Sequence, residues 1–292
     1  MQKFGFKETL IDRKLMDARI LSAANSIGFS RVVRYMQQLG KSMDDFSIAE
    51  IGCGTGTFSL LFNFLGVQTT LIDADEAALE AARTAFSLYG RSARFLKADV
   101  LSSVPEDLSG KFDIVVSGGL AEHFSGKDRQ KCILFHRMLL KSPGLAFISV
   151  PNALGPFYRI VTGFREITGT WDMEIEIPYS FLELRESAYQ AGFSRSEIFG
   201  NQPLLKDFGD YALGFCSAML AVFPAKVQNA IRKRVHRPIV HKKEEKDITV
   251  PSTQSVVSGV LAKASLPYRK TIVKTPKDYL SSGITLLGYL GN

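Results

Sequence analysis

The sequence has 292 residues, of which 46% are hydrophobic and 22% charged, with 36 basic and 29 acidic side chains and a formal net charge of +7. This composition excludes a disordered chain and a collagen-like repeat, and it suffices for one large α/β domain or two smaller ones. The basic excess is local, because residues 226–246 hold eight Lys or Arg and two Glu, whereas the rest of the chain holds 28 basic and 27 acidic residues. A generally basic nucleic-acid-binding surface is therefore not expected.

The three cysteines, Cys53, Cys132 and Cys216, are too far apart in the sequence for a disulfide scaffold or a CxxC pair, and no metal site is predicted. The first residues alternate charged and aromatic side chains, unlike a signal peptide. The apolar, uncharged stretch over residues 211–225 is shorter than the ~20 residues that span a bilayer as a helix. These features predict a soluble, cytoplasmic protein.

Apolar residues at helical spacing over residues 8–39 predict one or two leading helices. From residue 46 the pattern changes to short apolar runs that alternate with helical stretches. The predicted strands are 47–51, 67–72, 93–96, 112–116 and 145–150, and the predicted helices between them are 56–65, 75–89 and 126–141. Near-continuous apolar strands that alternate with helices are typical of an α/β fold with a doubly wound, mostly parallel sheet.

The pattern becomes less regular after residue 150. Residues 153–179 are aromatic-rich and predicted to be irregular, and a helix over 180–191 and a strand over 193–199 follow. An apolar helix over 208–223 and a last strand over 284–290 complete the prediction, which gives seven strands. If the last two strands pair, the residues between them are an insertion in an edge hairpin. The predicted parts are an N-terminal helical cover (1–45), a core (46–199), a basic and apolar insertion or cap (200–283) and a final strand (284–292).

A glycine-rich turn follows the first predicted strand, with Glu50 ahead of Gly52, Gly54 and Gly56. Ligands bind at this turn in doubly wound folds. The spacing is not the G-x-G-x-x-G of dinucleotide folds, and the sequence has no G-x-x-x-x-G-K-[ST] phosphate loop. An acidic residue at position 50 would repel a pyrophosphate and attract a cation.

This turn resembles the first motif of the class I S-adenosylmethionine-dependent methyltransferases, an acidic residue followed by G-x-G-x-G. The resemblance covers roughly residues 46–199, with Asp73 after the second strand and Asp99 after the third. The stretch from Leu120 to Glu122 and His123 is similar to the Leu-Glu-His turn of the family's small-molecule branch.

The resemblance implies a role for each matched residue. Glu50 would face the amino group of the cofactor, Asp73 the ribose hydroxyls, and Asp99 the adenine amino group, with ordinary capping as the alternative for Asp99. The predicted cofactor-binding residues are Glu50, Gly52, Cys53, Gly54, Gly56, Asp73, Ala74, Asp99, Val100, Ser117 and Gly118. His123 and Glu122 are the candidate catalytic residues, and the alternative is that they only shape the turn.

The implied reaction is methyl transfer to an oxygen, nitrogen or carbon of a small molecule. A nucleic-acid acceptor is not expected, because residues 117–120 are Ser-Gly-Gly-Leu where an Asn/Asp-Pro-Pro-aromatic turn would serve amine methylation, and no cysteine follows a proline. Two alternatives stay open: a non-catalytic cofactor-binding scaffold or regulatory protein, and a methyltransferase with a lipid, quinone-like or RNA acceptor. Residues 211–246 could make peripheral membrane contact, and the sequence does not indicate an oligomeric state.

Overall fold

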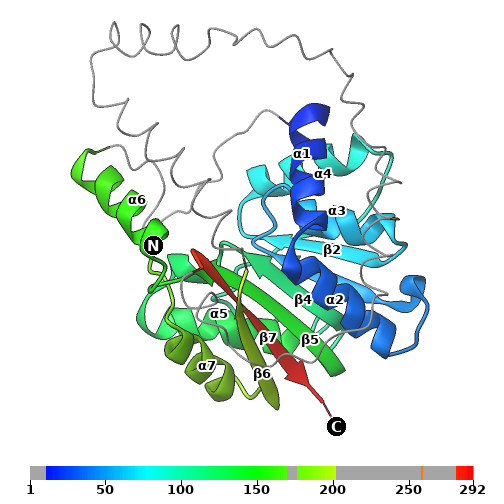
Figure 1. Cartoon of the computed structure of the whole chain (residues 1–292). Coiled ribbons are helices and arrows are strands. Elements are labelled where there is room, and N and C mark those ends of the chain that lie inside the picture. Colours follow the sequence, from blue (N-terminus) through cyan, green and yellow to red (C-terminus); the bar gives the residue numbers. More distant parts are fainter. Residues whose placement is uncertain (1–10, 170–175, 202–257, 259–280, 292) are drawn as a thin grey trace, which may run out of the picture.

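The computed structural model describes residues 11–169, 176–201, 258 and 281–291, which form a seven-stranded sheet with helices on both faces (Figure 1). The strands are β1 (Ser47–Ile51), β2 (Gln68–Asp73), β3 (Arg94–Lys97), β4 (Phe112–Gly118), β5 (Leu140–Pro151), β6 (Arg195–Gly200) and β7 (Gly283–Leu290). The helices are α1 (Arg13–Ala24), α2 (Ile27–Gln38), α3 (Thr57–Phe64), α4 (Glu76–Ser87), α5 (Gly126–Leu139), α6 (Pro156–Ile167) and α7 (Phe181–Gln190). Two 3₁₀ turns are η1 (Met43–Asp45) and η2 (Ala121–His123).

The strand order is β3-β2-β1-β4-β5-β7-β6, and every neighbouring pair is parallel except the two that include β7. The predicted fold class, an α/β fold with a mostly parallel seven-stranded sheet behind N-terminal helices, is confirmed. The chain proceeds outward from β1 in one direction and returns to β4 on its other side. Ligands of such sheets bind at this switch point, outside the carboxyl ends of the strands.

The last strand pairs with both β5 and β6, with Leu286 opposite Ile148 and Ile198. Figure 1 shows β6 and β7 side by side, so the two antiparallel strands at this edge are joined by the long connection between residues 200 and 283. The predicted helix over 208–223, Cys216 and the basic residues 226–246 lie outside the described residues. The division of the chain into a cover, a core and an insertion stays a prediction.

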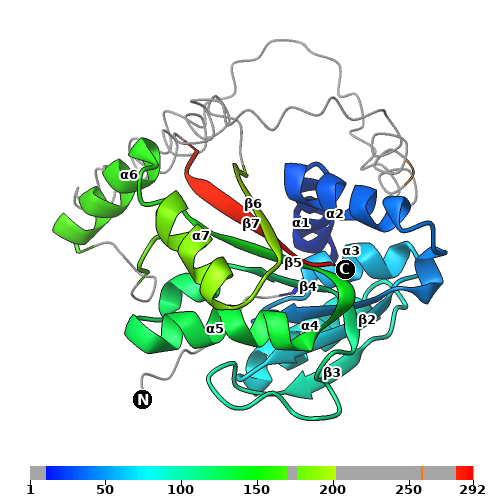
Figure 2. The same ribbon diagram turned by 90° about the horizontal axis from the view of Figure 1, so that it is seen from below.

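Two apolar layers hold the helices to the sheet. Buried residues of α1 to α4, such as Phe29 and Leu60, form one cluster with one face of the sheet. Buried residues of α5 and α7, such as Ile133 and Leu184, form the other (Figure 2). Burial of a side chain of this size stabilises the fold by roughly 1.5–3 kcal/mol relative to exposure, so each face contributes to positioning the strand ends.

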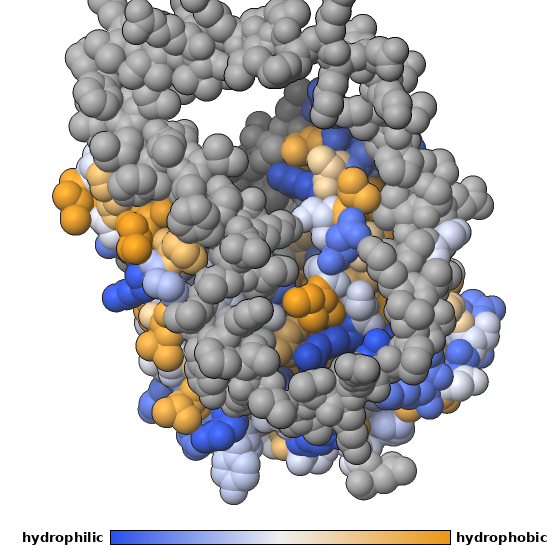
Figure 3. All heavy atoms as spheres, viewed as in Figure 1, coloured by the Kyte–Doolittle hydropathy of each residue, from blue (hydrophilic) through white to orange (hydrophobic). Residues whose placement is uncertain are grey.

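The prediction of irregular structure over 153–179 is wrong for its first part, because residues 156–167 form α6. Pro156 occupies the first turn, where its missing N–H costs nothing, and Tyr158 and Val161 turn toward the protein. The helix stands away from the sheet in Figures 1 and 2. Its Ile160 is 58% exposed and Ile167 88% exposed, and Figure 3 shows apolar side chains gathered where α6 lies.

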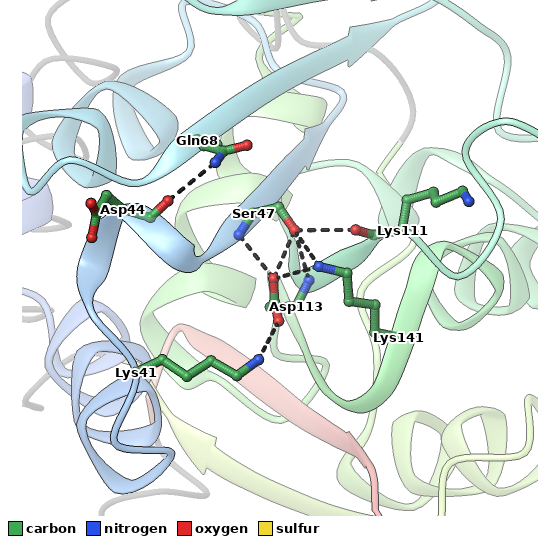
Figure 4. Close-up of polar contacts among 7 residues, drawn as sticks. All are labelled: Lys41, Asp44, Ser47, Gln68, Lys111, Asp113 and Lys141. Atoms are coloured by element: carbon green, nitrogen blue, oxygen red, sulfur yellow. Dashed lines mark hydrogen bonds and ion pairs between the residues drawn. The ribbon is translucent and has the colours of Figure 1, made fainter.

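A buried carboxylate fixes the amino ends of the central strands, opposite the candidate site. Asp113 of β4 accepts hydrogen bonds from the Ser47 amide and hydroxyl at 2.9 and 2.7 Å, and from Lys41 and Lys141 at 3.2 and 2.9 Å (Figure 4). Burial would raise the pKa of Asp113, but the hydrogen bonds from Ser47 and Lys141 outweigh burial and lower it. The ionised carboxylate therefore joins β1, β4, β5 and the chain after α2 at one point.

Candidate functional site

The glycine-rich turn between β1 and α3 is a tight left-handed turn. Gly52, Gly54 and Gly56 have φ angles of 60°, 50° and 65°, in the region that residues with a Cβ rarely adopt. A Cβ at Gly52 would lie 2.8 Å from Leu120 Cδ1, and a Cβ at Gly56 would lie 2.3 Å from Leu71 Cδ2. The turn is therefore packed against β2 on one side and against the turn after β4 on the other.

Glu50 lies buried on β1 beneath this turn. Its Oε2 accepts a hydrogen bond from the Ser59 amide at 2.7 Å, which satisfies one of the free N–H groups in the first turn of α3. Burial is the main reason that the pKa of Glu50 is raised to about 7, and the charge of Asp73 adds to the effect. A carboxyl group of this kind becomes fully ionised when a cation binds beside it.

Asp73 lies at the end of β2, next to the end of β1. Its two oxygens accept hydrogen bonds from the Gly54 amide at 3.3 Å and the Asp75 amide at 3.0 Å. Burial raises the pKa of Asp73, and the charge of Asp75 raises it further. Asp73 therefore joins the glycine turn to the start of α4, with Ala74 between them.

The residues predicted to meet the adenine lie next to Asp73. The Ala98 amide donates to the Asp73 carbonyl at 3.0 Å, and Asp99 Oδ1 accepts from the Leu101 amide at 2.9 Å. Val100 is buried in the adjoining apolar cluster. The acidic residues 50, 73 and 99 are thus brought to the same edge of the sheet. Asp99 makes the backbone hydrogen bond that ordinary capping requires, and this bond leaves its second oxygen for a further role.

Cys53 is a buried thiol within the glycine turn. Burial raises its pKa far above the ordinary value, and the charge of Glu50 acts in the same direction, so the thiol is neutral. Its Sγ donates weakly to the Gly54 carbonyl at 3.9 Å. Cys53 therefore contributes an apolar lining to the turn.

A buried histidine that the sequence did not indicate holds Ser117 at the end of β4. His136 Nδ1 lies 2.7 Å from the Cys132 carbonyl, and its Nε2 lies 2.8 Å from Ser117 Oγ. Burial lowers the pKa of His136 to about 4, so the ring is neutral. Because a carbonyl only accepts, Nδ1 carries the proton and the Ser117 hydroxyl must donate to Nε2. The Ser117 hydroxyl is thus hydrogen-bonded to His136 of α5. Ser117 and Gly118 can therefore contact a ligand through their backbone groups.

The candidate catalytic residues follow in η2. The Glu122 carboxyl is buried, which is the main reason that its pKa is raised to about 8, and the charge of Glu176 adds to the rise while that of Arg129 opposes it. His123 is partly exposed, and its amide donates to the Leu120 carbonyl at 3.2 Å. Both residues follow the turn whose Leu120 contacts Gly52.

Arg19 is a second residue that the sequence did not indicate. It projects from α1 and donates to Thr55 Oγ1 at 3.1 Å, and Thr55 Oγ1 lies 3.0 Å from Thr57 Oγ1. A guanidinium from the N-terminal helices therefore lies against the glycine turn. Its position 36 residues before Thr55 left no local sequence signal.

The described residues include no group of three or more His, Cys, Asp or Glu side chains arranged to hold a metal ion. Among the same residues, no helix combines the length and apolar composition needed to cross a membrane.

The fold and the glycine turn agree with the family model for a methyltransferase domain, which matches residues 48–144. The strand order and this match identify a class I S-adenosylmethionine-dependent methyltransferase domain within the chain. The cofactor of such a domain is S-adenosylmethionine.

Two curated relatives with higher identity extend the comparison. The ribosomal RNA small subunit methyltransferase C of Sodalis glossinidius is 40% identical over 72 residues, which are 24% of this chain and 19% of that protein. The malonyl-[acyl-carrier protein] O-methyltransferase of a Paenibacillus species is 34% identical over 131 residues, which are 44% of this chain and 46% of that protein. Matches of this kind cover about half the length of the relatives or less.

Two further matches have lower sequence identity. A ubiquinone biosynthesis O-methyltransferase of Rickettsia bellii is 24% identical over 143 residues, which are 48% of this chain and 57% of that protein. A solved structure of a S-adenosylmethionine-dependent methyltransferase from Archaeoglobus fulgidus has 14% identity and a TM-score of 0.47, and the match covers 89% of this chain and 94% of that one.

The contact between Gly52 and Leu120 predicts the effect of a single methyl group. Gly52→Ala should lose stability and most of its affinity for S-adenosylmethionine, because the new Cβ meets a positive φ and a side chain at 2.8 Å. Gly90→Ala is a matched control, since Gly90 also has a φ of +60° but has no atom within 4 Å of the added carbon. Gly90→Ala should cost about 1 kcal/mol in denaturant unfolding and leave cofactor binding unchanged. Equal losses in the two variants would contradict the packing argument.

Proposed function

We propose that this protein transfers a methyl group from S-adenosylmethionine to an oxygen, nitrogen or carbon atom of a small-molecule acceptor. The observation that carries the proposal is the pair of carboxyl groups, the buried Glu50 and the partly buried Asp73, at neighbouring strand ends around a left-handed glycine turn. The methyltransferase domain identified above includes both residues.

The residues present fit the cofactor by charge and by hydrogen-bonding capacity. Glu50 would hold the ammonium group, and Arg19 would complement the carboxylate at the same end of the cofactor. Asp73 would accept from the ribose hydroxyls, and Asp99 and Val100 would meet the adenine. Backbone groups of Gly52, Cys53, Gly54, Gly56, Ala74, Ser117 and Gly118 would line the remaining contact surface.

The bound cofactor supplies a methyl group already activated by a positive sulfur. The protein therefore has to exclude water, align the acceptor in line with the methyl group and, for some acceptors, remove a proton. His123 is the proposed base, because a partly exposed imidazole after β4 can accept a proton at the acceptor side of the site. Glu122 is the second proposed catalytic residue.

The turn after β4 supports a small-molecule acceptor. Ser117, Gly118, Gly119 and Leu120 provide no paired prolines and no aromatic side chain to stack on a flipped base. Two of the matched relatives are named as O-methyltransferases, which favours an oxygen acceptor, and the shorter match to the ribosomal RNA enzyme covers only 24% of this chain. The exposed apolar residues of α6, the helix that follows β5, would suit an acceptor with an apolar part.

Substitution of Asp73 tests the cofactor site. Asp73→Ala should weaken S-adenosylmethionine binding by at least tenfold in calorimetry, because it removes the ribose partner and the acceptor of the Gly54 amide. Asp75→Ala is the matched control, since Asp75 caps α4 through the Ala77 amide and should change stability alone. Normal cofactor affinity in a folded Asp73→Ala variant would refute this site.

Protonation of Glu50 gives a pH-dependent prediction. A carboxyl group with a pKa of about 7 is half protonated in the free protein at pH 7, and a bound ammonium group would favour the ionised form. Binding should therefore release about half a proton at pH 7, and affinity should rise between pH 6 and pH 8. Calorimetry in buffers of different ionisation enthalpy measures this release. Glu50→Gln should abolish it, and an unchanged release would contradict the role of Glu50.

Turnover separates an enzyme from a scaffold that only binds the cofactor. Incubation with S-adenosylmethionine and a panel of phenols, carboxylic acids and amines should yield S-adenosylhomocysteine with at least one acceptor, detected by mass spectrometry. Saturable binding without any product above the protein-free rate would favour the scaffold. Steeply salt-dependent RNA binding with methylated RNA as the product would favour the RNA alternative.

A further inference from the structure

Glu122 has a buried carboxyl group with an unused oxygen. Glu122 is 2% exposed, and its backbone carbonyl accepts a hydrogen bond from the Ile177 amide at 2.8 Å. Within the described part of the chain, Oε2 has no hydrogen-bond partner. Buried polar atoms are nearly always paired, so an unpaired one at the edge of a binding site indicates a ligand.

Arg129, whose charge opposes the rise in the pKa of Glu122, is bound to other partners. Arg129 of α5 donates to Glu183 Oε1 at 2.6 Å and to the Ile177 and Pro178 carbonyls at 2.7 and 3.1 Å, and its guanidinium stacks 3.3 Å from the centre of the Tyr179 ring. These contacts fix the guanidinium on the segment that precedes α7, and no ion pair with Glu122 is present in the described structure.

The other groups that face Glu122 do not favour a negative charge. Glu176, which accepts from the Tyr158 hydroxyl at 2.9 Å, adds a second negative charge. Cys132 of α5 is buried, and burial holds its thiol neutral by raising its pKa. Burial, with Glu176, outweighs the hydrogen bond from the Glu122 backbone and the charge of Arg129, and the pKa of Glu122 rises to about 8, so the neutral acid predominates at pH 7.

The carboxyl group borders the cofactor turn. Glu122 Oε1 lies 3.6 Å from the position that a Cβ would take at Gly119. Leu120, the residue after Gly119, contacts Gly52. The positive φ of Gly119, 76°, brings the chain back over this side of the site. Glu122 is therefore separated from the glycine turn by one short loop, residues 119–121.

We propose that Glu122 recognises the acceptor as a neutral carboxylic acid that donates a hydrogen bond to an acceptor oxygen. The site then takes molecules that carry a carbonyl, carboxylate or phenolate oxygen near the methylated atom, and it disfavours ammonium groups. This inference rests on the proposed function, because it requires an acceptor beside the cofactor turn. A carboxyl group that keeps its proton does not act as the base, which leaves proton removal to His123.

Infrared difference spectroscopy tests the protonation directly. With S-adenosylhomocysteine bound at pH 7, the spectrum of wild type minus Glu122→Gln should contain the carbonyl band of a protonated carboxyl group, and this band should disappear as the pH rises through about 8. Glu50→Gln is a control that identifies the contribution of the other buried glutamate with a raised pKa. Absence of the band at pH 7, or its titration below pH 6, would overturn the proposal.

Tyr179→Phe provides a second control, because the Tyr179 hydroxyl is also buried without a partner among the described residues. An unchanged Glu122 band in this variant is the expected result. A shift of the band on loss of the hydroxyl would assign the unused oxygen to an internal contact with Tyr179 and overturn the role in acceptor binding.

Three probes of similar shape test the acceptor class: benzoate, benzamide and benzylammonium, measured by ligand-observed NMR on protein saturated with S-adenosylhomocysteine. Wild type and Glu122→Gln, whose amide also donates, should bind the two oxygen-bearing probes about tenfold more tightly than benzylammonium. Glu122→Ala should lose this preference. A preference for benzylammonium that Glu122→Gln abolishes, or binding of none of the probes, would overturn the acceptor class.

The same samples separate this inference from the proposed function. Calorimetry should show that S-adenosylhomocysteine binds equally to wild type, Glu122→Gln and Glu122→Ala, and thermal unfolding should show that all three are folded. Failure of wild type to bind would refute the proposed function. Normal binding without the carboxyl band would refute the role of Glu122 alone.

Discussion

The turn between β1 and α3 depends on three glycines with left-handed backbone angles, and the geometry of the candidate site depends on this turn. Gly52, Gly54 and Gly56 reverse the chain so that the amino end of α3 comes back over β1, where the Ser59 amide reaches Glu50. The Gly54 amide binds the carboxylate of Asp73. One backbone conformation thus sets the positions of both acidic groups.

The same turn joins the two halves of the site. Gly52 has no side chain, so Leu120 packs directly on its backbone, and Leu120 belongs to the loop that carries Glu122 and His123. Glu50 and Glu122 are both buried acids with raised pKa values, but their surroundings differ. Glu50 receives an amide of α3 and lies next to Asp73, which suits a cationic ligand. Glu122 has a hydrogen bond from its own backbone, but burial and the charge of Glu176 outweigh it, so the neutral form is favoured.

Sequence patterns predicted the sheet well because parallel strands buried on both faces are short, continuous apolar runs. They also located the acidic residues, since strand ends and glycine turns have local signals. The helix α6 was missed because Tyr158, Ile160 and Val161 favour strands, and Gly163 weakens a helix. The helix becomes evident only in the structure, where Tyr158 and Val161 on one of its faces are buried.

Long-range contacts account for the residues that no pattern indicated. Arg19 contacts the glycine turn from α1, His136 binds Ser117 from the interior of α5, and Arg129 fixes the segment before α7. Each depends on a partner at least 19 residues away, so neither spacing nor composition could identify it. Such contacts follow from the packing of the two helical layers on the sheet.

A crystal structure with S-adenosylhomocysteine bound would show whether Glu50 and Asp73 hold the cofactor. The expected arrangement has the ligand across the carboxyl ends of β1, β2 and β4, with its amino group at Glu50, its ribose at Asp73 and its sulfur facing η2. A ligand bound elsewhere, or one whose ribose makes no contact with Asp73, would contradict it.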